Sequence, residues 1–327
     1  MQILDASATR RALPFEQLIP ALRAMFVADC TVPQRHVHEL ALPSGERLTS
    51  LLMPAWLAGR YYGIKTINIA PGNAVLGLPG LHATYVLFDA VTGVPLALID
   101  GNEITARRTA AASALAASCL VPHDARHLLV VGAGRIARLL PDAYRAVRPI
   151  QQVTVWARDR EQSQTLVSEL RAHGHNATAA DDLQSAVQQA QIVSCATLSN
   201  TALIEGAWLQ PGSHLDLIGS FTPAMREADD ACFSGAALYV DTEEALEKSG
   251  DLIGPLVRGV LSKSDVCGTL TSLSRQQAGV VQQRRKNEGK QQRTVFKSVG
   301  TALEDLAAAM LVWEGTSTPL GQQPHPG

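Results

Sequence analysis

Residues 127–138 read HLLVVGAGRIAR, and this short stretch decides the fold that we expect for the chain. An apolar run typical of a buried strand leads directly into Gly132 and Gly134, and a helical pattern begins at the next residue. Together with Ala137, the glycines form a G-x-G-x-x-A arrangement, which lets backbone N–H groups at a helix N-terminus approach a pyrophosphate. A tight structural turn is the alternative, but the flanking strand and helix favour a dinucleotide site. The predicted cofactor contacts of this turn are Gly132, Ala133, Gly134, Arg135 and Ile136.

Strand-like and helix-like segments alternate from this point onward. The strand-like segments include QVTVWAR, QIVSCAT, GSHLDLIGS and ALYVDT, and helical patterns such as REQSQTLVSELRAHG separate them. Such alternation with short connections is typical of parallel βαβ units. We therefore predict an α/β chain in which residues 121–296 form a doubly wound Rossmann domain.

The first third of the chain has a different pattern. Strand-like segments such as ERLTSLLMPAW and YYGIKTINIA follow one another, and Thr92–Gly93 between two apolar runs is typical of a hairpin turn. These features predict an antiparallel or mixed sheet, followed by an alanine-rich helix over residues 104–120. Apolar residues at helical spacing also predict a final helix over residues 298–314, which we expect to pack back on the first domain. The prediction is a discontinuous α+β domain of residues 1–120 and 297–327.

The composition excludes several functional classes. The chain has 327 residues, of which 46% are hydrophobic and 18% charged, so it can bury large cores in about two domains. A formal net charge of -2 gives no general attraction to nucleic acid, and the Gln- and Arg-rich stretch 275–293 is interpreted as solvated surface. No apolar run approaches the ~20 residues of a membrane span, and the N-terminus lacks a leader pattern. We expect a cytoplasmic protein with no nucleic-acid or membrane partner.

The cysteines and histidines predict no metal site. The five cysteines are far apart and never form C-x-x-C, so neither a disulfide framework nor a thiolate zinc site is expected. We expect them to be buried as small apolar residues. His123 and His127 are four residues apart, but Pro122 and the strand pattern that follows argue against a helix that would bring them to one face.

The end of the second strand of the predicted Rossmann domain bears on the choice of cofactor. A site specific for NAD commonly has an acid here, which binds the ribose hydroxyls. This sequence has Ala157 instead, followed by Arg158, and an arginine can grip a 2′-phosphate through two N–H groups. We therefore predict NADPH, with contacts from Ala157, Arg158 and Asp159. NADH stays open because Asp159 could turn toward the ribose.

Two basic residues of the first domain lie in apolar surroundings. Lys65 is part of YYGIKTINIA, and Arg47 directly precedes LTSLLMP. A buried, unpaired cation costs several kcal/mol, so such residues are either paired internally or bind an anionic ligand. The spacing alone leaves both interpretations open.

Several blocks of sequence are specific when they are taken together. They include GIKTINIAPGN, DAVTG, ITARRTAA, VVGAGRIA, DLIGSFTPAMRE and TVFKSVGTALEDLAAA. Over about residues 10–314 the chain resembles the ornithine cyclodeaminase/mu-crystallin family. The resemblance implies a two-domain subunit, in which the discontinuous domain binds substrate and forms a homodimer.

The resemblance also implies roles for individual residues. Arg47 and Lys65 match basic residues that bind the carboxylate of the substrate, and Arg108 matches one placed between the substrate and the nicotinamide phosphates. Val299 and Gly300 match contacts to the substrate and the nicotinamide. Further cofactor contacts are implied for Thr84, Arg108, Thr109, Thr197, Ile218, Ser220 and Ser298.

The turn after Gly219 distinguishes the activities found in this family. The resemblance implies that a cyclodeaminase carries a catalytic aspartate two residues before the proline of this turn, where the present sequence has Phe221. Asp216 lies within the predicted strand and Glu227 lies four residues beyond Pro223, so no carboxylate nearby replaces it. The resemblance therefore favours a reductase of a cyclic imino acid over a cyclodeaminase.

The expected reaction is the NAD(P)H-dependent reduction of Δ1-pyrroline-2-carboxylate, or of Δ1-piperideine-2-carboxylate, to L-proline or L-pipecolate. Arg47, Lys65 and Arg108 would hold the carboxylate, Phe221 would give the ring an apolar wall, and Lys65 or a water would protonate the imine nitrogen. The alternatives are an alanine or other amino-acid dehydrogenase, then an ornithine cyclodeaminase, then a non-enzymatic ligand-binding protein. The three cations and the intact glycine turn argue against a purely binding role.

Overall fold

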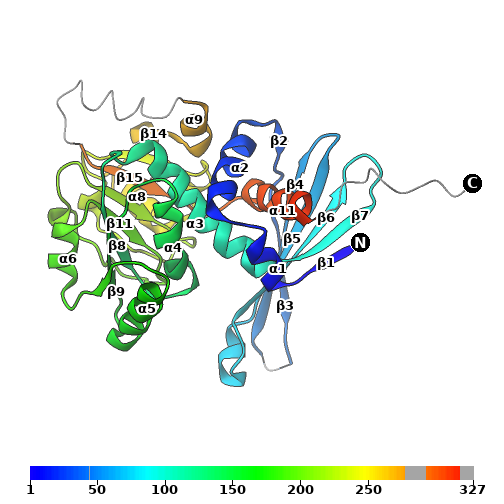
Figure 1. The fold of residues 1–327 in the computed structure, drawn as a ribbon, viewed down its shortest axis with the longest axis horizontal. Coiled ribbons are helices and arrows are strands. Elements are labelled where there is room, and N and C mark those ends of the chain that lie inside the picture. Colours follow the sequence, from blue (N-terminus) through cyan, green and yellow to red (C-terminus); the bar gives the residue numbers. More distant parts are fainter. Residues whose placement is uncertain (44, 277–291, 317–327) are drawn as a thin grey trace, which may run out of the picture. The chain divides into compact units, whose positions relative to one another are not determined.

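The structure, a computed structural model, describes residues 1–43, 45–276 and 292–316 (Figure 1). The chain divides into two compact units: Met1–Arg108 together with the chain from Ala302 onward form the first unit, and Thr109–Thr301 form the second unit. The sequence predicts boundaries after residues 120 and 296 instead, because helix α3 (Gly101–Leu120) reads as one uninterrupted element although it crosses the first boundary. Most of the Gln- and Arg-rich stretch, interpreted as solvated surface, lies outside the described residues.

A sheet of seven strands forms the centre of the first unit, as far as the structure describes it. Its order is β1-β7-β6-β5-β4-β2, with β3 also paired to β4, and only β1 and β7 run parallel. The predicted hairpin is confirmed, because Asp89 accepts the N–H groups of Val91 and Thr92, and Gly93 has a φ of 75° that favours glycine. The strands are β1 (Gln2–Leu4), β2 (Cys30–Thr31), β3 (His36–Ala41), β4 (Arg47–Leu57), β5 (Tyr61–Ile69), β6 (Leu81–Asp89) and β7 (Pro95–Asp100).

One face of this sheet is covered and the other is partly open. Along β5, Gly63, Lys65 and Ile67 are buried while their neighbours are more exposed, which is the alternation of a strand with one covered face. Helix α11 (Ala302–Thr316) packs on the covered face against β4, β5 and β6, and also against α2 (Phe15–Val27). The final helix therefore belongs to the first unit, as predicted. The remaining short elements are α1 (Ala6–Arg11) and the 3-10 helix η1 (Pro71–Leu76).

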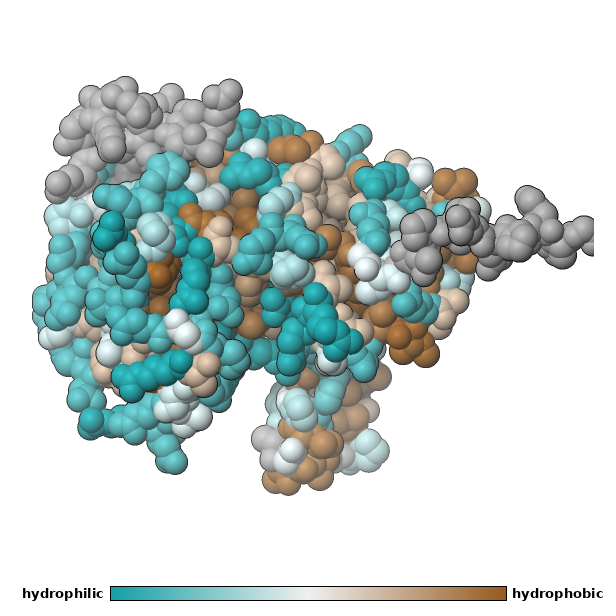
Figure 2. Space-filling model, in the orientation of Figure 1, coloured by the Kyte–Doolittle hydropathy of each residue, from teal (hydrophilic) through white to brown (hydrophobic). Residues whose placement is uncertain are grey.

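The open face of the sheet carries apolar side chains. Trp56, Tyr62 and Phe88 are cross-strand neighbours, and their ring centroids lie 6.4 and 5.4 Å apart. Further apolar residues are exposed around η1 and β3, where Figure 2 shows brown surface at the lower end of the unit. They are Val37, Leu40, Val75, Leu76, Leu78 and Leu81.

The second unit is built on a parallel sheet of eight strands within the described residues. Its order is β10-β9-β8-β11-β12-β15-β13-β14, so the strand order reverses between β8 and β11, as in a doubly wound fold. The predicted α/β class is confirmed. The strands are β8 (His127–Val131), β9 (Gln152–Trp156), β10 (Ala177–Ala179), β11 (Ile192–Cys195), β12 (His214–Leu217), β13 (Ala237–Val240), β14 (Val266–Thr269) and β15 (Thr294–Lys297). The helices are α4 (Arg135–Arg145), α5 (Arg160–Ala172), α6 (Leu183–Gln189), α7 (Ala245–Lys248), α8 (Gly250–Val257) and α9 (Leu270–Arg275), with 3-10 turns at Gly206–Trp208, Asp230–Cys232 and Lys263–Asp265.

The described residues also limit other kinds of site. None of their helices is both long and apolar enough to cross a membrane. No three of their His, Cys, Asp or Glu side chains gather as a metal site would require. All five cysteines are free thiols. Three of them are buried as expected, but Cys30 is half-buried and the expectation is wrong for Cys267, which is exposed at the edge strand β14.

Candidate functional site

The residues predicted to bind the cofactor in the second unit gather at one edge of its sheet. Gly132, Ala157, Thr197, Ile218 and Ser298 each follow, within two residues, the C-terminal end of a strand. The five strands concerned are consecutive neighbours in the order β9-β8-β11-β12-β15. Ligands of open parallel sheets bind outside this edge, at the point where the strand order reverses. Topology therefore brings together residues that are far apart in the sequence.

The glycine turn fits a dinucleotide. Gly132 has a φ of 117°, and a Cβ atom there would lie 2.6 Å from the carbonyl oxygen of Ala196, so glycine is required. Gly134 is the N-cap of α4, with open space beside it, and no side chain of the described residues caps the helix. The free N–H groups of the first helical turn, which begins with Arg135 and Ile136, suit a pyrophosphate.

The acid that follows the second strand of this unit is engaged in capping a helix. Asp159 is the N-cap of α5, where its Oδ1 accepts the N–H of Glu161 at 2.9 Å and its Oδ2 accepts the side-chain amide of Gln162 at 3.1 Å. Such a cap stabilises the helix by about 1 kcal/mol, which would be lost if the carboxylate turned toward a ribose. Arg158 next to it is exposed. At this strand end the carboxylate is therefore engaged by the helix, and an exposed arginine lies next to it.

Glu227 holds two of the predicted cofactor loops. Its buried carboxylate accepts the N–H of Thr197 at 2.7 Å, the Thr197 hydroxyl at 2.8 Å and the N–H of Gly219 at 2.7 Å. Burial raises the pKa of Glu227 to about 7, against the opposing influence of Lys297. The loops after β11 and β12 are thus tied to one carboxylate.

Asp241 holds the loop after β15 in a similar way. Its buried carboxylate accepts the N–H of Val299 at 2.7 Å and the N–H of Gly300 at 2.6 Å. Gly300 has a φ of 78°, so this loop turns where glycine is favoured. The predicted contacts Ser298, Val299 and Gly300 therefore lie on backbone that a buried acid fixes.

The turn after Gly219 offers no free carboxylate. Phe221 is 46% exposed at the position where a cyclodeaminase would carry its aspartate. Asp216 is buried in β12 and accepts three hydroxyl groups, while Glu227 is committed to the backbone contacts described above. The three hydroxyls belong to Ser113, Tyr144 and Ser194. Neither acid is available as a substitute for the aspartate.

The first unit contains a buried cluster of four charges, which we call the Lys65 cluster. Lys65 Nζ lies 2.6 Å from Asp305 Oδ2, and Arg108 lies 3.0 Å from Asp305 Oδ1 and 2.7 Å from Glu304 Oε2. Two cations and two carboxylates balance each other, so Lys65 is paired internally in this structure, and its role toward a substrate carboxylate stays a prediction. Burial lowers the pKa of Lys65 to about 8, although Asp305 opposes that shift.

The pairing register separates Arg47 from Lys65. Met53 of β4 lies opposite Lys65, and Arg47 is six residues earlier on the same strand, roughly 20 Å away at the usual rise of a strand. The Arg47 side chain is 72% exposed and forms an ion pair with Glu39 of the adjacent strand. Two side chains cannot hold one carboxylate across that distance, so the predicted partnership of Arg47 and Lys65 does not form within this sheet.

A different arginine lies in the row of Lys65. β3 pairs with β4 so that His36 lies opposite Leu52. If the same register continues by one residue, Arg35 lies opposite Met53, and Met53 lies opposite Lys65. Arg35 is then two strand spacings, or about 10 Å, from Lys65. Residues directly opposite each other point to the same face, and Arg35 is only half-buried.

The other two threonines of the predicted cofactor set, Thr84 and Thr109, do not follow strand ends of the second sheet as Thr197 does. Thr84 is exposed on β6, opposite Thr66 and therefore on the open face of the sheet rather than the face of Lys65. Thr109 is half-buried on α3, one residue after Arg108, at the start of the second unit.

Sequence reasoning missed the acids of both units. Glu304 and Asp305 were not singled out, although two adjacent carboxylates in the otherwise apolar TALEDLAAA present the same signal as Lys65 in its apolar strand. From the sequence, Glu227 is a rejected replacement for the missing aspartate, and Asp241 has no predicted role. Their partners are backbone N–H groups, which leave no mark in a sequence.

Comparisons with known proteins agree with this geometry. The model of the ornithine cyclodeaminase/mu-crystallin family matches residues 4–318. The chain is 41% identical to a Δ1-pyrroline-2-carboxylate reductase of Paracoccus denitrificans, over 95% of this chain and 96% of the relative. The structure of Thermococcus litoralis Δ1-pyrroline-2-carboxylate reductase with NADH and L-proline is similar at a TM-score of 0.84 and 27% identity, covering 96% and 97% of the two chains.

A second solved structure broadens the comparison. It is an archaeal alanine dehydrogenase dimer with bound NAD, similar at a TM-score of 0.85 and 25% identity, covering 96% of this chain and 95% of the other. Its fold and cofactor class match the second unit described above. With the family match spanning almost the whole described chain, the protein belongs to the ornithine cyclodeaminase/mu-crystallin family.

Proposed function

We propose that the protein reduces a cyclic imino acid, Δ1-pyrroline-2-carboxylate or Δ1-piperideine-2-carboxylate, to L-proline or L-pipecolate with NAD(P)H. The observation that carries the proposal is the turn after Gly219, where Phe221 replaces an acid and the two carboxylates nearest in the sequence, Asp216 and Glu227, are both engaged. Deamination and ring closure need an acid and base at that turn, whereas reduction of a preformed C=N bond does not. The resemblance to two reductases of Δ1-pyrroline-2-carboxylate supports the same conclusion.

The Lys65 cluster would anchor the substrate. We assign the carboxylate to Lys65 and Arg108, and we add Arg35 in place of Arg47 because Arg35 continues the row of Lys65. The cluster is neutral by itself, and Arg35 would add a third guanidinium or ammonium donor for the bound carboxylate. Arg47 is left as an exposed partner of Glu39.

The reaction needs one hydride and one proton. A bound reduced nicotinamide supplies the hydride to the carbon of the C=N bond, and the π electrons of that bond pass to nitrogen. Lys65, whose pKa burial lowers to about 8, would supply the proton to nitrogen directly or through a water. Asp305 at 2.6 Å keeps the ammonium charged near neutral pH and oriented. Phe221 and the loop at Val299 and Gly300 would give the ring an apolar surface.

NADPH is the proposed cofactor in preference to NADH. Asp159 caps α5 by accepting the backbone N–H groups of Glu161 and Gln162, and Arg158 is exposed at the same strand end. This arrangement favours a 2′-phosphate over free ribose hydroxyls. The glycine turn and the loops at Thr197, Ile218, Ser220 and Ser298 would hold the rest of the dinucleotide.

A homodimer is also part of the proposal. Its support is the open face of the first sheet, with the aromatic row of Trp56, Tyr62 and Phe88, and the exposed apolar side chains around η1. Apolar patches of this kind mark contact surfaces with other chains. Sedimentation at several concentrations tests this part separately, since a monomer at all concentrations contradicts it.

One set of assays tests the activity. NADPH oxidation is followed with each of the two cyclic imino acids, and with pyruvate plus ammonia, while ornithine is offered with NAD and ammonia release is measured. We expect rapid oxidation with a cyclic imino acid, far above the rate with pyruvate and ammonia. Release of ammonia from ornithine would contradict the proposal, and faster turnover of pyruvate would indicate an alanine dehydrogenase instead.

A further inference from the structure

The carboxylate of Glu227 receives only hydrogen-bond donors. Its Oε1 accepts from the backbone and hydroxyl of Thr197, and its Oε2 accepts from the backbone of Gly219. A glutamine would turn its amide N–H groups toward a backbone N–H, which can only donate, and a protonated acid would either do the same at Oε2 or lose the hydrogen bond from the Thr197 hydroxyl at Oε1. A Cβ atom at residue 219 would collide with both the Thr197 carbonyl and this carboxylate, so the turn is closed tightly against Glu227.

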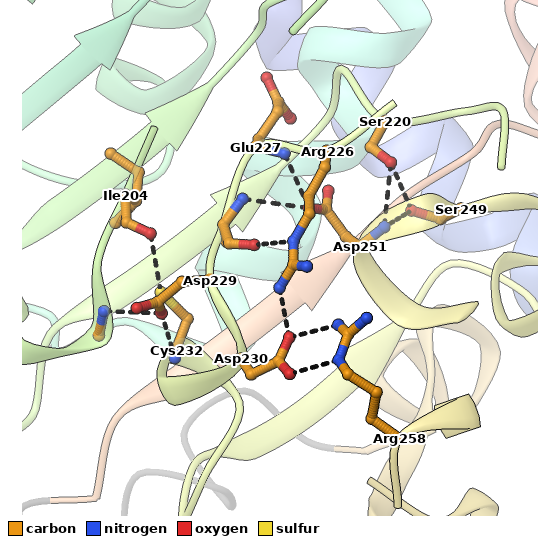
Figure 3. A network of polar contacts seen from close by, with 12 residues as sticks. Ile204, Ser220, Arg226, Glu227, Asp229, Asp230, Cys232, Ser249, Asp251 and Arg258 are labelled. Carbon is orange, nitrogen blue, oxygen red and sulfur yellow. Dashed lines mark hydrogen bonds and ion pairs between the residues drawn. The ribbon is translucent and has the colours of Figure 1, made fainter. Parts of the chain in front are cut away.

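A second layer holds Glu227 itself (Figure 3). Asp251 Oδ1 accepts the backbone N–H of Glu227 at 2.8 Å and that of Ala228 at 3.1 Å. The N–H of Asp251 is directed at Ser220 Oγ, 3.2 Å away, and Lys297 Nζ lies 3.5 Å from Asp251 Oδ2. Asp251 therefore links the segment of Glu227 to Ser220, which is itself a predicted cofactor contact.

We propose that Glu227 is a positioning residue, whose ionised carboxylate holds Thr197 and the Gly219–Ser220 turn in the arrangement that binds the nicotinamide half of the cofactor. Asp251 and Lys297 support it from behind. The inference rests on the proposed function only in that these loops bind NAD(P)H, and it does not depend on which imino acid is reduced. Glu227 would touch neither substrate nor cofactor.

The affinity for the cofactor should then depend on pH. Charged and titratable groups approach Glu227 from several elements of the sheet and from α8. Protonation of Glu227 would turn a donor toward Thr197 or Gly219 and loosen the turn, so binding should weaken as the pH falls through about 7. The groups that act on Glu227 are Lys297, Asp251 and Cys195, and Lys297 in turn acts on Asp216 and Asp241.

The experiment measures cofactor dissociation constants on the full chain, by fluorescence titration between pH 6 and 9, for the wild type, Glu227→Gln, Glu227→Asp and Asp230→Asn. NADH is titrated beside NADPH, because it lacks the 2′-phosphate and so separates protonation of the ligand from protonation of Glu227. Asp230 is the matched control: it lies three residues away and pairs with Arg226 and Arg258 at the surface (Figure 3).

We expect Glu227→Gln to weaken binding of both cofactors at least tenfold at pH 8 and to abolish the pH dependence. Glu227→Asp should retain the pH dependence with weaker binding, and Asp230→Asn should stay within twofold of wild type. The wild type should lose about tenfold in affinity from pH 8 to pH 6, the ratio that a pKa of about 7 requires.

Wild-type affinity in Glu227→Gln, or equal losses in Glu227→Gln and Asp230→Asn, would overturn the inference. If Glu227→Gln does not fold, as judged by its thermal melt, the pH profiles of wild type and Glu227→Asp decide: a flat wild-type profile for NADH overturns it. A chain that shows all the expected binding effects but reduces no cyclic imino acid would refute the proposed function and leave this inference standing.

Discussion

Each of the two compact units buries a lysine near carboxylates, but the two clusters are satisfied differently. In the first unit, Lys65 and Arg108 form ion pairs with Asp305 and Glu304, so each carboxylate is neutralised by a cationic side chain. In the second unit, Lys297 Nζ lies 3.5 Å from Asp251 Oδ2, whereas Glu227 and Asp241 accept backbone N–H groups. In the first unit, the carboxylates hold Lys65 and Arg108 in place, so that both cations can bind a ligand. In the second unit, the carboxylates hold backbone N–H groups and so fix the conformation of the loops at Thr197, Gly219 and Gly300.

This difference predicts that the buried charges of the first unit take part in the reaction, whereas those of the second unit position the loops that bind the cofactor. A cation of the Lys65 cluster can exchange part of its contact with Asp305 for a contact with a substrate carboxylate, since both partners are side chains. The acids of the second unit cannot release their partners without moving the loops at Thr197, Gly219 and Gly300. We therefore expect changes in the first cluster to affect turnover and changes in the second to affect cofactor binding.

The largest effect is expected from removing each lysine. Lys65→Met should lower kcat/KM for the imino acid by at least about 100-fold, equal to about 2.7 kcal/mol of barrier, because both the anchor and the proton donor are lost. Lys297→Met should instead lower the melting temperature and weaken NADPH binding, with kcat at saturating NADPH reduced less than tenfold. Steady-state kinetics and thermal melts of both variants measure this. Equal losses of kcat in the two variants would erase the distinction between the clusters.

The next effect tests whether Arg35 or Arg47 binds the substrate carboxylate together with the Lys65 cluster. Arg35→Ala should raise KM for the imino acid by about 10- to 100-fold, as expected for a charge-assisted hydrogen bond worth about 1.5–3 kcal/mol. Arg47→Ala is the matched control and should change KM less than threefold, because Arg47 is exposed and paired with Glu39. The opposite order of the two KM values would restore Arg47 as the carboxylate anchor.

A smaller effect concerns the second unit, away from its buried acids. Arg158→Ala should raise the dissociation constant of NADPH about tenfold and leave that of NADH nearly unchanged, because only NADPH carries the 2′-phosphate. Parallel titrations with the two cofactors measure the change in their ratio. An equal change for both would show that Arg158 does not select the cofactor.

The smallest effect is the pH dependence of the first cluster. Burial depresses the pKa of Lys65 to about 8, so its ammonium form is present below that pH and is lost above it. At saturating NADPH, kcat/KM should therefore fall about fourfold between pH 7 and pH 8.5. Lys65→Arg should lack this decline, because arginine stays charged. The buried acids of the second unit have the opposite pH dependence: cofactor affinity should decrease as the pH falls, because Glu227 becomes protonated.

Much of the second unit could be predicted because its signals are local. The glycines of VVGAG mark a turn that only glycine can adopt at Gly132, and alternating strand and helix patterns imply a parallel sheet. The C-terminal ends of parallel strands meet at one edge, so the predicted contacts had to gather there. The cytoplasmic location and the homodimer stay predictions.

The sequence by itself determined which segments form strands and helices, the dinucleotide turn, and the lack of an acid at Phe221. Only the tertiary structure decided which charges meet. Strand register sets Arg35 rather than Arg47 in the row of Lys65, and α11 brings Asp305 to the same lysine from the far end of the chain. Strand register and helix docking depend on packing between segments that are distant in the sequence, whereas turns and amphipathic patterns are determined by residues close together in the sequence.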